Sequence, residues 1–130
     1  MKRIYVAGPY SADNVLSVLN NIREGMRWSK RLMLDGYAPF CPWLDFHYQL
    51  MLREGEQLTV EQYYEYSLAW LRVSDAMFVV PNWTHSKGTQ KEILVAAEMR
   101  IPVFFEYDKG WMSAILSQQK TCQNTAHEAK

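Results

Sequence analysis

The chain has 130 residues, of which 48% are hydrophobic and 22% charged, a composition typical of one compact globular domain. Its 14 basic and 14 acidic side chains cancel, so no overall field draws it to a nucleic-acid polymer or an anionic membrane. No apolar run approaches the ~20 residues of a membrane span, and the first residues contain no signal-peptide core. Two cysteines without CxxC spacing fit a reducing compartment, so we expect a cytoplasmic protein.

The first half of the chain predicts a strand, a helix and a second strand. Residues 4–7 form a short apolar run before a Gly-Pro pair, which is typical of a strand buried in a parallel sheet. From about residue 13 to residue 34, apolar side chains recur at helical spacing, and an Asp-Gly pair supplies the helix stop. Residues 37–40 form a brief strand whose proline places it at a strand end or a sheet edge.

The second half continues this alternation after an irregular stretch. Residues 41–58 have no clean period and predict a long, partly helical excursion. Thr59 and Gln62 form a capping box that opens a helix through Leu71. The remaining predicted elements are a buried strand at 76–80, a helix at 87–100, a last buried strand at 101–105 and a terminal helix from 110 to about 120. We expect one domain over residues 1–120 and a polar C-terminal tail over residues 121–130.

Strands that alternate with helices at this chain length predict a three-layer α/β domain with a parallel sheet of four to five strands and right-handed crossovers. Ligands of such sheets bind beyond the carboxyl ends of the strands. The loops after Ala7, Phe40 and Val80 should therefore share one rim, and these loops hold the unusual residues of the chain.

The loop after the third predicted strand has the features of an anion site. Ser86 stands where this loop enters a helix, and the N–H groups just after it lack partners within the helix. A phosphate there would meet those N–H groups, the positive helix end and the serine hydroxyl, while Gly88 permits a close approach. The alternative is an ordinary serine cap on a glycine-containing loop.

Glu92 occupies an unusual place for a carboxylate, because it lies over Ala96 at the edge of the predicted core stripe of its helix. That stripe comprises Ile93, Ala96, Ala97 and the stem of Arg100. Helical side chains lean toward the amino terminus, so Glu92 should project past Gly88 toward the anion site. A buried carboxylate there could attack a sugar carbon in glycosidic cleavage. The alternative is a surface carboxylate paired with a neighbouring Lys or Arg.

Other side chains of the three loops carry weaker signals. Asp45 and His47 could contact a base or a sugar, although loop residues of these types are more often solvated. Trp43, Phe46 and Trp83 could stack on a nucleobase or belong to the core. The three histidines show no metal-ligand spacing, so we expect no metal site. The Gly-Pro pair of the first loop matches neither the dinucleotide-binding nor the phosphate-loop glycine pattern.

A family resemblance is carried by residues 4–11 (IYVAGPYS), 71–76 (LRVSDA) and 83–88 (WTHSKG), followed by Glu92. Over about residues 3–116 the chain resembles the nucleoside 2-deoxyribosyltransferase superfamily, in particular its small phage and bacterial branches. The resemblance implies a flavodoxin-like sheet and a nucleophilic glutamate, by position Glu92, that forms a covalent ribosyl-enzyme intermediate. It also implies that the first loop binds sugar and phosphate. The candidate residues there are Tyr5, Gly8, Tyr10 and Ser11.

Two serines connect the chain with the members of this superfamily that hydrolyse deoxynucleoside 5′-monophosphates. Six residues before the nucleophile, the nucleoside transferases carry an aspartate that holds the 5′-hydroxyl, whereas these hydrolases carry a serine on the phosphate; here the residue is Ser86. The hydrolases also extend a serine of a Ser-Ala-hydrophobic-hydrophobic run to the phosphate of a neighbouring subunit. Ser113 begins such a run here, which implies a homodimer or a higher homo-oligomer.

One position departs from the resemblance. Members of the superfamily usually place an aspartate eight residues before the strand-opening Asp75, where it helps bind the sugar and aids departure of the base, and this chain has Ser67 there. Three alternatives stay open. Another acid such as Asp45 or Glu65 takes over, the leaving base is protonated from elsewhere, or the chain binds nucleotides without efficient turnover.

The sequence thus suggests a cytoplasmic N-glycosidase that acts on a nucleoside 5′-monophosphate, with 2′-deoxyribose as the expected sugar. Ser86, Gly88 and a neighbour's Ser113 would hold the phosphate while Glu92 attacks the sugar, and no metal or organic cofactor is expected. The alternatives are a transferase that exchanges bases between nucleosides, a non-catalytic nucleotide-sensing module and, more remotely, a flavodoxin-type electron carrier.

Overall fold

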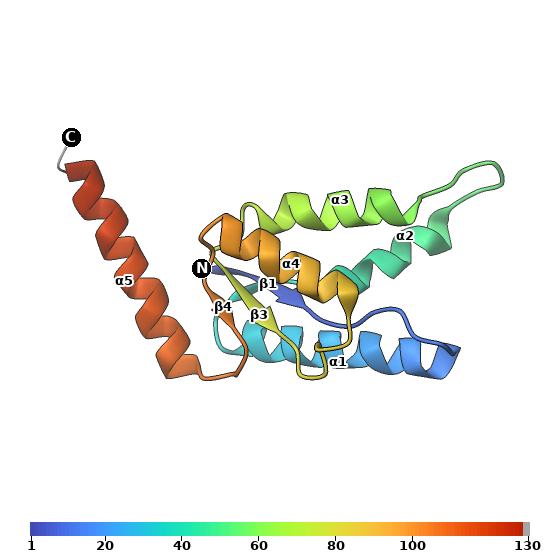
Figure 1. The fold of residues 1–130 in the computed structure, drawn as a ribbon, viewed down its shortest axis with the longest axis horizontal. Coiled ribbons are helices and arrows are strands. Elements are labelled where there is room, and N and C mark those ends of the chain that lie inside the picture. Colours follow the sequence, from blue (N-terminus) through green and yellow to red (C-terminus); the bar gives the residue numbers. More distant parts are fainter. Residues whose placement is uncertain (129–130) are drawn as a thin grey trace.

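The chain folds as the alternation of strands and helices that its sequence predicts. The computed structural model describes the backbone of residues 1–128 and the side chains of residues 1–118. The predicted irregular excursion contains a 3-10 helix, η1, and a short helix, α2. In chain order (Figure 1) the elements are β1 (Arg3–Ala7), α1 (Val15–Leu34), β2 (Ala38–Phe40), η1 (Pro42–Asp45), α2 (Phe46–Met51), α3 (Val60–Leu71), β3 (Ala76–Val79), α4 (Lys87–Glu98), β4 (Val103–Phe104) and α5 (Lys109–Glu128).

The four strands form one parallel sheet in the order β2-β1-β3-β4. Tyr5 of β1 lies opposite Phe40 of β2 on one side and Met77 of β3 on the other. The two central strands are buried along residues 4–7 and 76–79, as their continuous apolar runs predict. The proline-containing β2 is an edge strand, as expected, because proline has no N–H to donate to a second neighbour.

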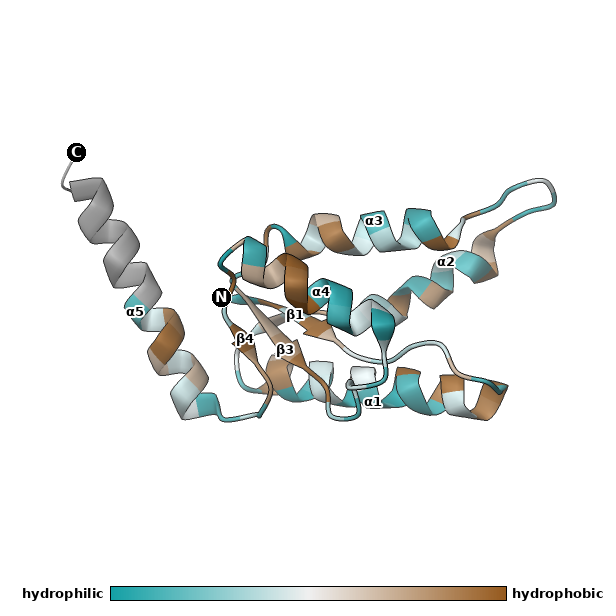
Figure 2. Cartoon of the chain, in the orientation of Figure 1, coloured by the Kyte–Doolittle hydropathy of each residue, from teal (hydrophilic) through white to brown (hydrophobic). Residues whose placement is uncertain are grey.

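Helices cover both faces of this sheet. On one face, Leu32 of α1 and Met112 of α5 join a core cluster with Phe78 of β3. On the other face, Leu71 of α3 and Ala96 of α4 pack in a second cluster. Figure 2 shows the largely hydrophobic strands between helices that carry both hydrophilic and hydrophobic residues. The three-layer, flavodoxin-like α/β architecture is therefore confirmed.

The packing of α1 against η1 shapes the end of the sheet where the predicted loops meet. A Cβ atom at Gly25 would lie 2.2 Å from the ring of Trp43, so only glycine lets the ring lie against this helix. The indole N–H of Trp43 donates to the carbonyl of Pro9 at 2.9 Å and fixes the first loop. Trp43 is only 2% exposed, so it is a core residue that also supports the loops.

Three sequence-based expectations about the last elements are wrong. The last strand is β4, of two residues rather than residues 101–105, because Pro102 precedes it and offers only its carbonyl, which accepts from Met77 N–H at 2.9 Å. Helix α4 ends at Glu98, since Arg100 adopts a left-handed backbone (φ 59°). Ala97 and Arg100 are consequently exposed rather than part of the core stripe, whereas Thr89 is buried.

The terminal helix is longer than the sequence predicts. It runs to Glu128 rather than to about residue 120, and the last two residues of the predicted polar tail lie outside the described residues. Within residues 1–128, none of the helices has the length and apolar character needed to cross a membrane.

Candidate functional site

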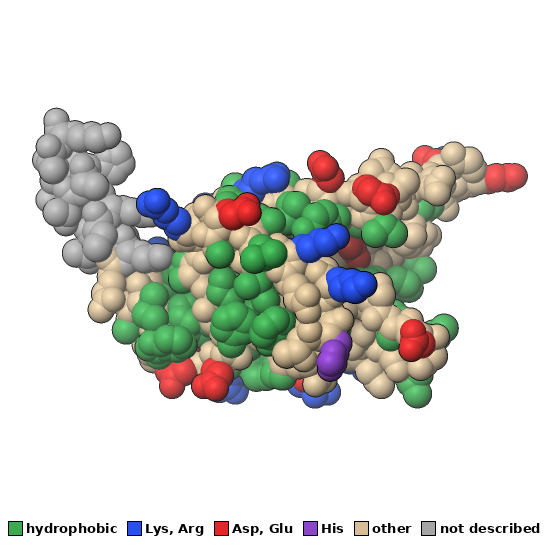
Figure 3. Space-filling model, viewed as in Figure 1, with side chains coloured by type: hydrophobic (Ala, Val, Ile, Leu, Met, Phe, Trp, Pro, Cys, Tyr) green, Lys and Arg blue, Asp and Glu red, His purple; other side chains and the backbone are tan. Residues whose placement is uncertain are grey.

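Two adjoining cavities open at the carboxyl end of the strands, where the sequence places the rim. The first has a volume of about 310 Å³ and extends toward η1 and α3. The second, of about 450 Å³, lies at the amino-terminal end of α4. Both volumes are in the range of small-molecule sites. Figure 3 shows the molecule hollowed at this end, between the α2–α3 segment and the start of α1. The residues that line both cavities are Gly8, Tyr10, Ser11 and Glu92.

The second cavity has the features of an anion site. Ser86 caps α4, and its hydroxyl oxygen accepts from the Thr89 N–H at 3.3 Å and from the Thr89 hydroxyl at 2.8 Å. The first N–H groups of a helix have no partners within the helix and carry its positive dipole end. A Cβ atom at Gly88 would meet no atom within 4 Å, so the backbone here faces open space. An anionic group could therefore approach the α4 backbone closely.

Glu92, one turn further along α4, lines both cavities. Its Oε2 atom is buried and has no hydrogen-bond partner among the described residues. Burial raises the pKa of the Glu92 carboxyl to about 7, and the Tyr5 hydroxyl lowers it by a smaller amount. A buried carboxylate without a cation partner is costly, because its charge has lost the stabilisation that water provides. Such a group is typical of a functional site rather than of a surface helix.

Tyr5 of β1 lies beside Glu92, and Ser67 of α3 lies beside Tyr5. The Tyr5 hydroxyl is buried and makes no hydrogen bond with the described residues, and it lies close enough to the Glu92 carboxylate to interact with it electrostatically. Burial, and then the Glu92 charge, raise the pKa of Tyr5 well above its usual value, whereas Ser67 lowers it. Tyr5 is therefore neutral at physiological pH and can act as a hydrogen-bond donor toward Glu92.

The first cavity has aromatic walls and one more carboxylate. Tyr10, Tyr63 and Tyr64 line it, and Asp45 enters from the end of η1. Burial raises the pKa of Asp45, while the Tyr10 hydroxyl lowers it. Burial, and then the charge of Asp45, raise the pKa of Tyr10 to about 12. Aromatic faces suit a planar ring, because stacking buries both surfaces.

The structure brings most of the candidate residues together. The first cavity is lined by Tyr5, Gly8, Tyr10, Ser11, Asp45, Ser67 and Glu92, and the second by Gly8, Tyr10, Ser11, Ser86, Gly88 and Glu92. His47 lines neither of them: its side chain is exposed, and its Nδ1 atom lies 3.0 Å from the carbonyl of Leu44. Of the two other aromatic candidates, Phe46 is exposed and Trp83 packs against Phe105.

Sequence reasoning found Ser67 of α3 but missed two tyrosines of this helix. Tyr63 and Tyr64 line the first cavity but were not among the candidates, although Tyr63 and Ser67 have the i, i+4 spacing of one helix face. That spacing was the available signal. It has no meaning without knowledge of which face of α3 looks toward the sheet.

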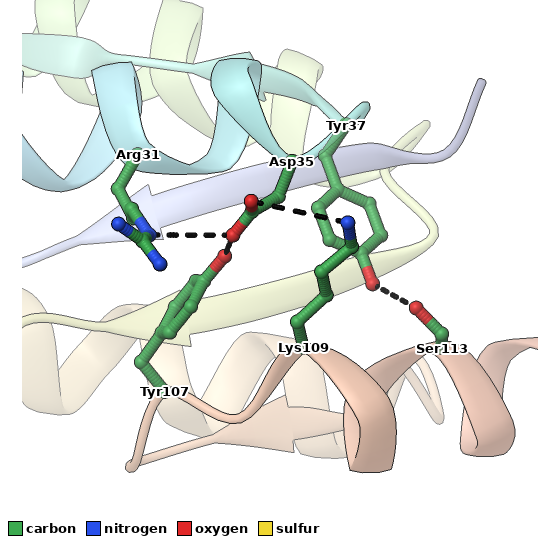
Figure 4. Close-up of polar contacts among 6 residues, drawn as sticks. All are labelled: Arg31, Asp35, Tyr37, Tyr107, Lys109 and Ser113. Atoms are coloured by element: carbon green, nitrogen blue, oxygen red, sulfur yellow. Dashed lines mark hydrogen bonds and ion pairs between the residues drawn. The ribbon is translucent and has the colours of Figure 1, made fainter.

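Ser113 lies away from both cavities of its own chain. Its hydroxyl is 2.6 Å from the hydroxyl of Tyr37, at the opposite end of α1 (Figure 4). Nearby, Asp35 accepts from the Tyr107 hydroxyl and pairs with Arg31 at 3.3 Å and with Lys109 at 3.9 Å. These contacts attach the first turns of α5 to α1. A role of Ser113 in a neighbouring subunit stays a prediction.

Among the side chains of residues 1–118, no three His, Cys, Asp or Glu groups are close enough to hold a metal ion. His127 and Cys122 lie outside the described side chains. Cys41 is buried and not in a disulfide.

Comparison with known proteins agrees with this architecture. A solved structure of a 2-deoxyribosyltransferase from the psychrotolerant bacterium Bacillus psychrosaccharolyticus is similar to this chain, with a TM-score of 0.56 and 18% identity over 82% of this chain and 76% of that one. The similarity shows a shared fold. No curated protein matches the sequence. The model of one family, described as "Domain of unknown function (DUF7768)", matches residues 2–106, most of the folded part, and the chain therefore belongs to that family.

Proposed function

We propose that the protein is an N-glycosidase that hydrolyses the bond between base and sugar in a nucleoside 5′-monophosphate, with 2′-deoxyribose as the expected sugar. The observation that carries the proposal is the carboxylate of Glu92, whose Oε2 atom is buried without a hydrogen-bond partner among the described residues and which borders both an aromatic-walled cavity and a helix amino terminus. The base would lie in the first cavity, the phosphate at Ser86 and Gly88, and the sugar between them against Glu92. The shared fold with a 2-deoxyribosyltransferase supports glycosyl chemistry at this position.

The reaction would proceed in two displacements at the same carbon. A carboxylate oxygen of Glu92 forms a bond with C1′, and the C1′–N bond breaks with its electron pair going to the base. Water then attacks C1′, the ester bond to Glu92 breaks, and the sugar phosphate leaves with retained configuration. The raised pKa of Glu92 makes its ionised form a stronger nucleophile in the first step.

The phosphate would give the site its preference for nucleotides over nucleosides. The α4 amino terminus offers free N–H groups and a positive dipole end, and Ser86 adds a hydroxyl. We further propose that a second copy of the chain contributes its Ser113 hydroxyl to this phosphate, so that the active unit is a dimer or a larger homo-oligomer.

The proposal is tested by incubating the protein with each of the common nucleoside and deoxynucleoside 5′-monophosphates and separating the products by liquid chromatography. Free base together with sugar 5-phosphate is the expected result. The Glu92→Gln variant serves as the matched control, because it removes the nucleophile and preserves the shape of the side chain.

A second incubation distinguishes hydrolysis from the transferase alternative, which the similarity to a 2-deoxyribosyltransferase favours. Here a nucleoside and a different free base are supplied without any phosphate. Exchange of the bases at a rate equal to nucleotide hydrolysis would contradict the hydrolase proposal. Tight binding of nucleotides without any product would contradict both enzymes and indicate a sensing module.

A further inference from the structure

The proposed reaction needs a proton at the departing base, because a nucleobase that leaves as an anion is a poor leaving group. The first cavity is where the base would lie, so the donor should be found among its walls. Ser67 lines this cavity beside Tyr5, but a serine hydroxyl is far too weak an acid for the task. Glu92 cannot serve either, since in this mechanism it is the nucleophile.

The sequence offers two acids, Asp45 and Glu65, as proton donors to the departing base, and the structure distinguishes between them. Glu65 is an exposed residue of α3 and lines neither cavity. Asp45, at the end of η1, is only partly exposed and lines the first cavity together with Glu92. These are the two carboxylates among the residues that line this cavity, and they come from different elements.

We propose that Asp45 is the general acid that protonates the departing base, an inference that rests on the proposed glycosidase function. Its carboxyl group stands in a wall of the cavity proposed for the base, whereas Glu92 borders the space proposed for the sugar. This arrangement assigns one carboxyl group to each end of the bond that breaks, as in retaining glycosidases generally.

The surroundings of Asp45 favour this role. The aspartate is partly buried, and burial favours its protonated form by raising the pKa. The Tyr10 hydroxyl faces it from the first loop, and a Tyr10 pKa of about 12 keeps that hydroxyl protonated. The charge of Asp45 also contributes to raising the pKa of Tyr63 in α3 and of Cys41, which follows β2. Tyr10 is thus a positioning residue that can donate to the aspartate once its proton has left.

The proton is returned in the second displacement. In the first step, the Asp45 proton moves to the base as the C1′–N bond breaks, and Asp45 becomes a carboxylate. In the second step, Asp45 takes a proton from the attacking water while the bond between C1′ and Glu92 breaks. The sum is one nucleotide and one water converted to free base and sugar phosphate, with both carboxyl groups restored.

The test compares leaving groups that need a proton with leaving groups that do not. The protein and its Asp45→Asn variant are assayed with dGMP and 7-methyl-dGMP, whose base already carries a positive charge. If pyrimidine nucleotides are the better substrates, dUMP and 5-fluoro-dUMP form the pair, because fluorine makes the base a better leaving group. The Glu65→Gln variant is the matched control for removing a carboxylate from the same region.

For Asp45→Asn we expect the single-turnover rate of base release, which reports the first displacement alone, to fall at least about a hundredfold on the unmodified purine nucleotide and to stay within a factor of about three on the 7-methyl derivative. With the pyrimidine pair, the loss should be clearly smaller for the fluorinated substrate. Glu65→Gln should match the unmodified protein on all of them, and Tyr10→Phe should lower the single-turnover rate less than Asp45→Asn.

Equal losses in the single-turnover rate of base release on both members of a pair would overturn the inference, because they would show a structural role for Asp45. An unchanged single-turnover rate in Asp45→Asn would overturn it too. Absence of base release by the unmodified protein from every nucleotide would instead overturn the proposed glycosidase function, and the role of Asp45 with it. The two failures are therefore distinguishable.

Discussion

Two carboxylates at opposite ends of the sheet show how differently a fold can treat the same chemical group. Asp35, at the end of α1, is 14% exposed and has three partners: Arg31, Lys109 and the Tyr107 hydroxyl. Glu92 in α4 faces Tyr5, no cation pairs with it among the described residues, and its Oε2 atom is buried without a hydrogen bond. The first is arranged for stability. The second costs stability and faces a cavity, which is what a reactive group requires.

The largest expected effect of a substitution is on turnover at Glu92. Glu92→Gln should lower base release from nucleotides by at least about a thousandfold, because no covalent ester can form. Nucleotide binding, measured by calorimetry, should persist. Retention of base release in this variant would contradict the mechanism, and Glu92 would then be no more a reactive group than Asp35.

The same variant should be more stable than the unmodified protein at high pH. The Glu92 pKa of about 7 in the folded protein exceeds the ordinary 4.5, so the folded state binds more protons between these values and its stability falls as pH rises. Tyr5 and Tyr64, which face Glu92, remain neutral there. Above pH 7, Glu92→Gln should therefore raise the free energy of unfolding by up to about 3 kcal/mol. Thermal unfolding of both proteins at pH 4 and pH 8 measures this gain in stability. An equal gain at the two pH values would show that ionisation of Glu92 is not its cause.

Asp35 should show the opposite behaviour. Asp35→Ala removes the acceptor of the Tyr107 hydroxyl and the partner of two cations, so we expect the free energy of unfolding to fall by about 2 kcal/mol. Turnover at saturating nucleotide should not change. The milder Tyr107→Phe variant, which keeps the ring, is the matched control in chemical denaturation. A loss of turnover in Asp35→Ala that remains when the protein is fully folded would place Asp35 in the functional machinery.

The smallest expected effect is at Ser86, which both stabilises the fold as a helix cap and, in the proposal, binds the substrate. Ser86→Ala removes a helix cap worth about 1 kcal/mol and a hydroxyl proposed to hold the phosphate. We expect KM for nucleotides to rise about tenfold, with kcat little changed. The control is KM for the corresponding nucleosides, which should stay the same. A parallel rise for nucleosides would show that Ser86 supports the site only as a cap.

The fold was predictable because the local sequence patterns specify the same strands and helices that the parallel sheet requires. The apolar runs of β1 and β3, the Thr59 capping box and the Asp35-Gly36 stop each specify an element without help from the rest of the chain. The prediction was wrong where a boundary depends on backbone conformation, as at Arg100 and Pro102. A left-handed residue and a missing donor end elements earlier than side-chain periodicity indicates.

The sequence by itself determined the alternation of strands and helices, the rim on which the loops meet and the unusual place of Glu92, because these follow from periodicity and chain order. Only the tertiary structure decided which of the candidates share a cavity. It excluded His47 and Glu65 from the cavity walls and included Asp45, Tyr63 and Tyr64. The physical reason is that burial and the loss of hydrogen-bond partners arise from the packing of separate layers, and no local pattern encodes them.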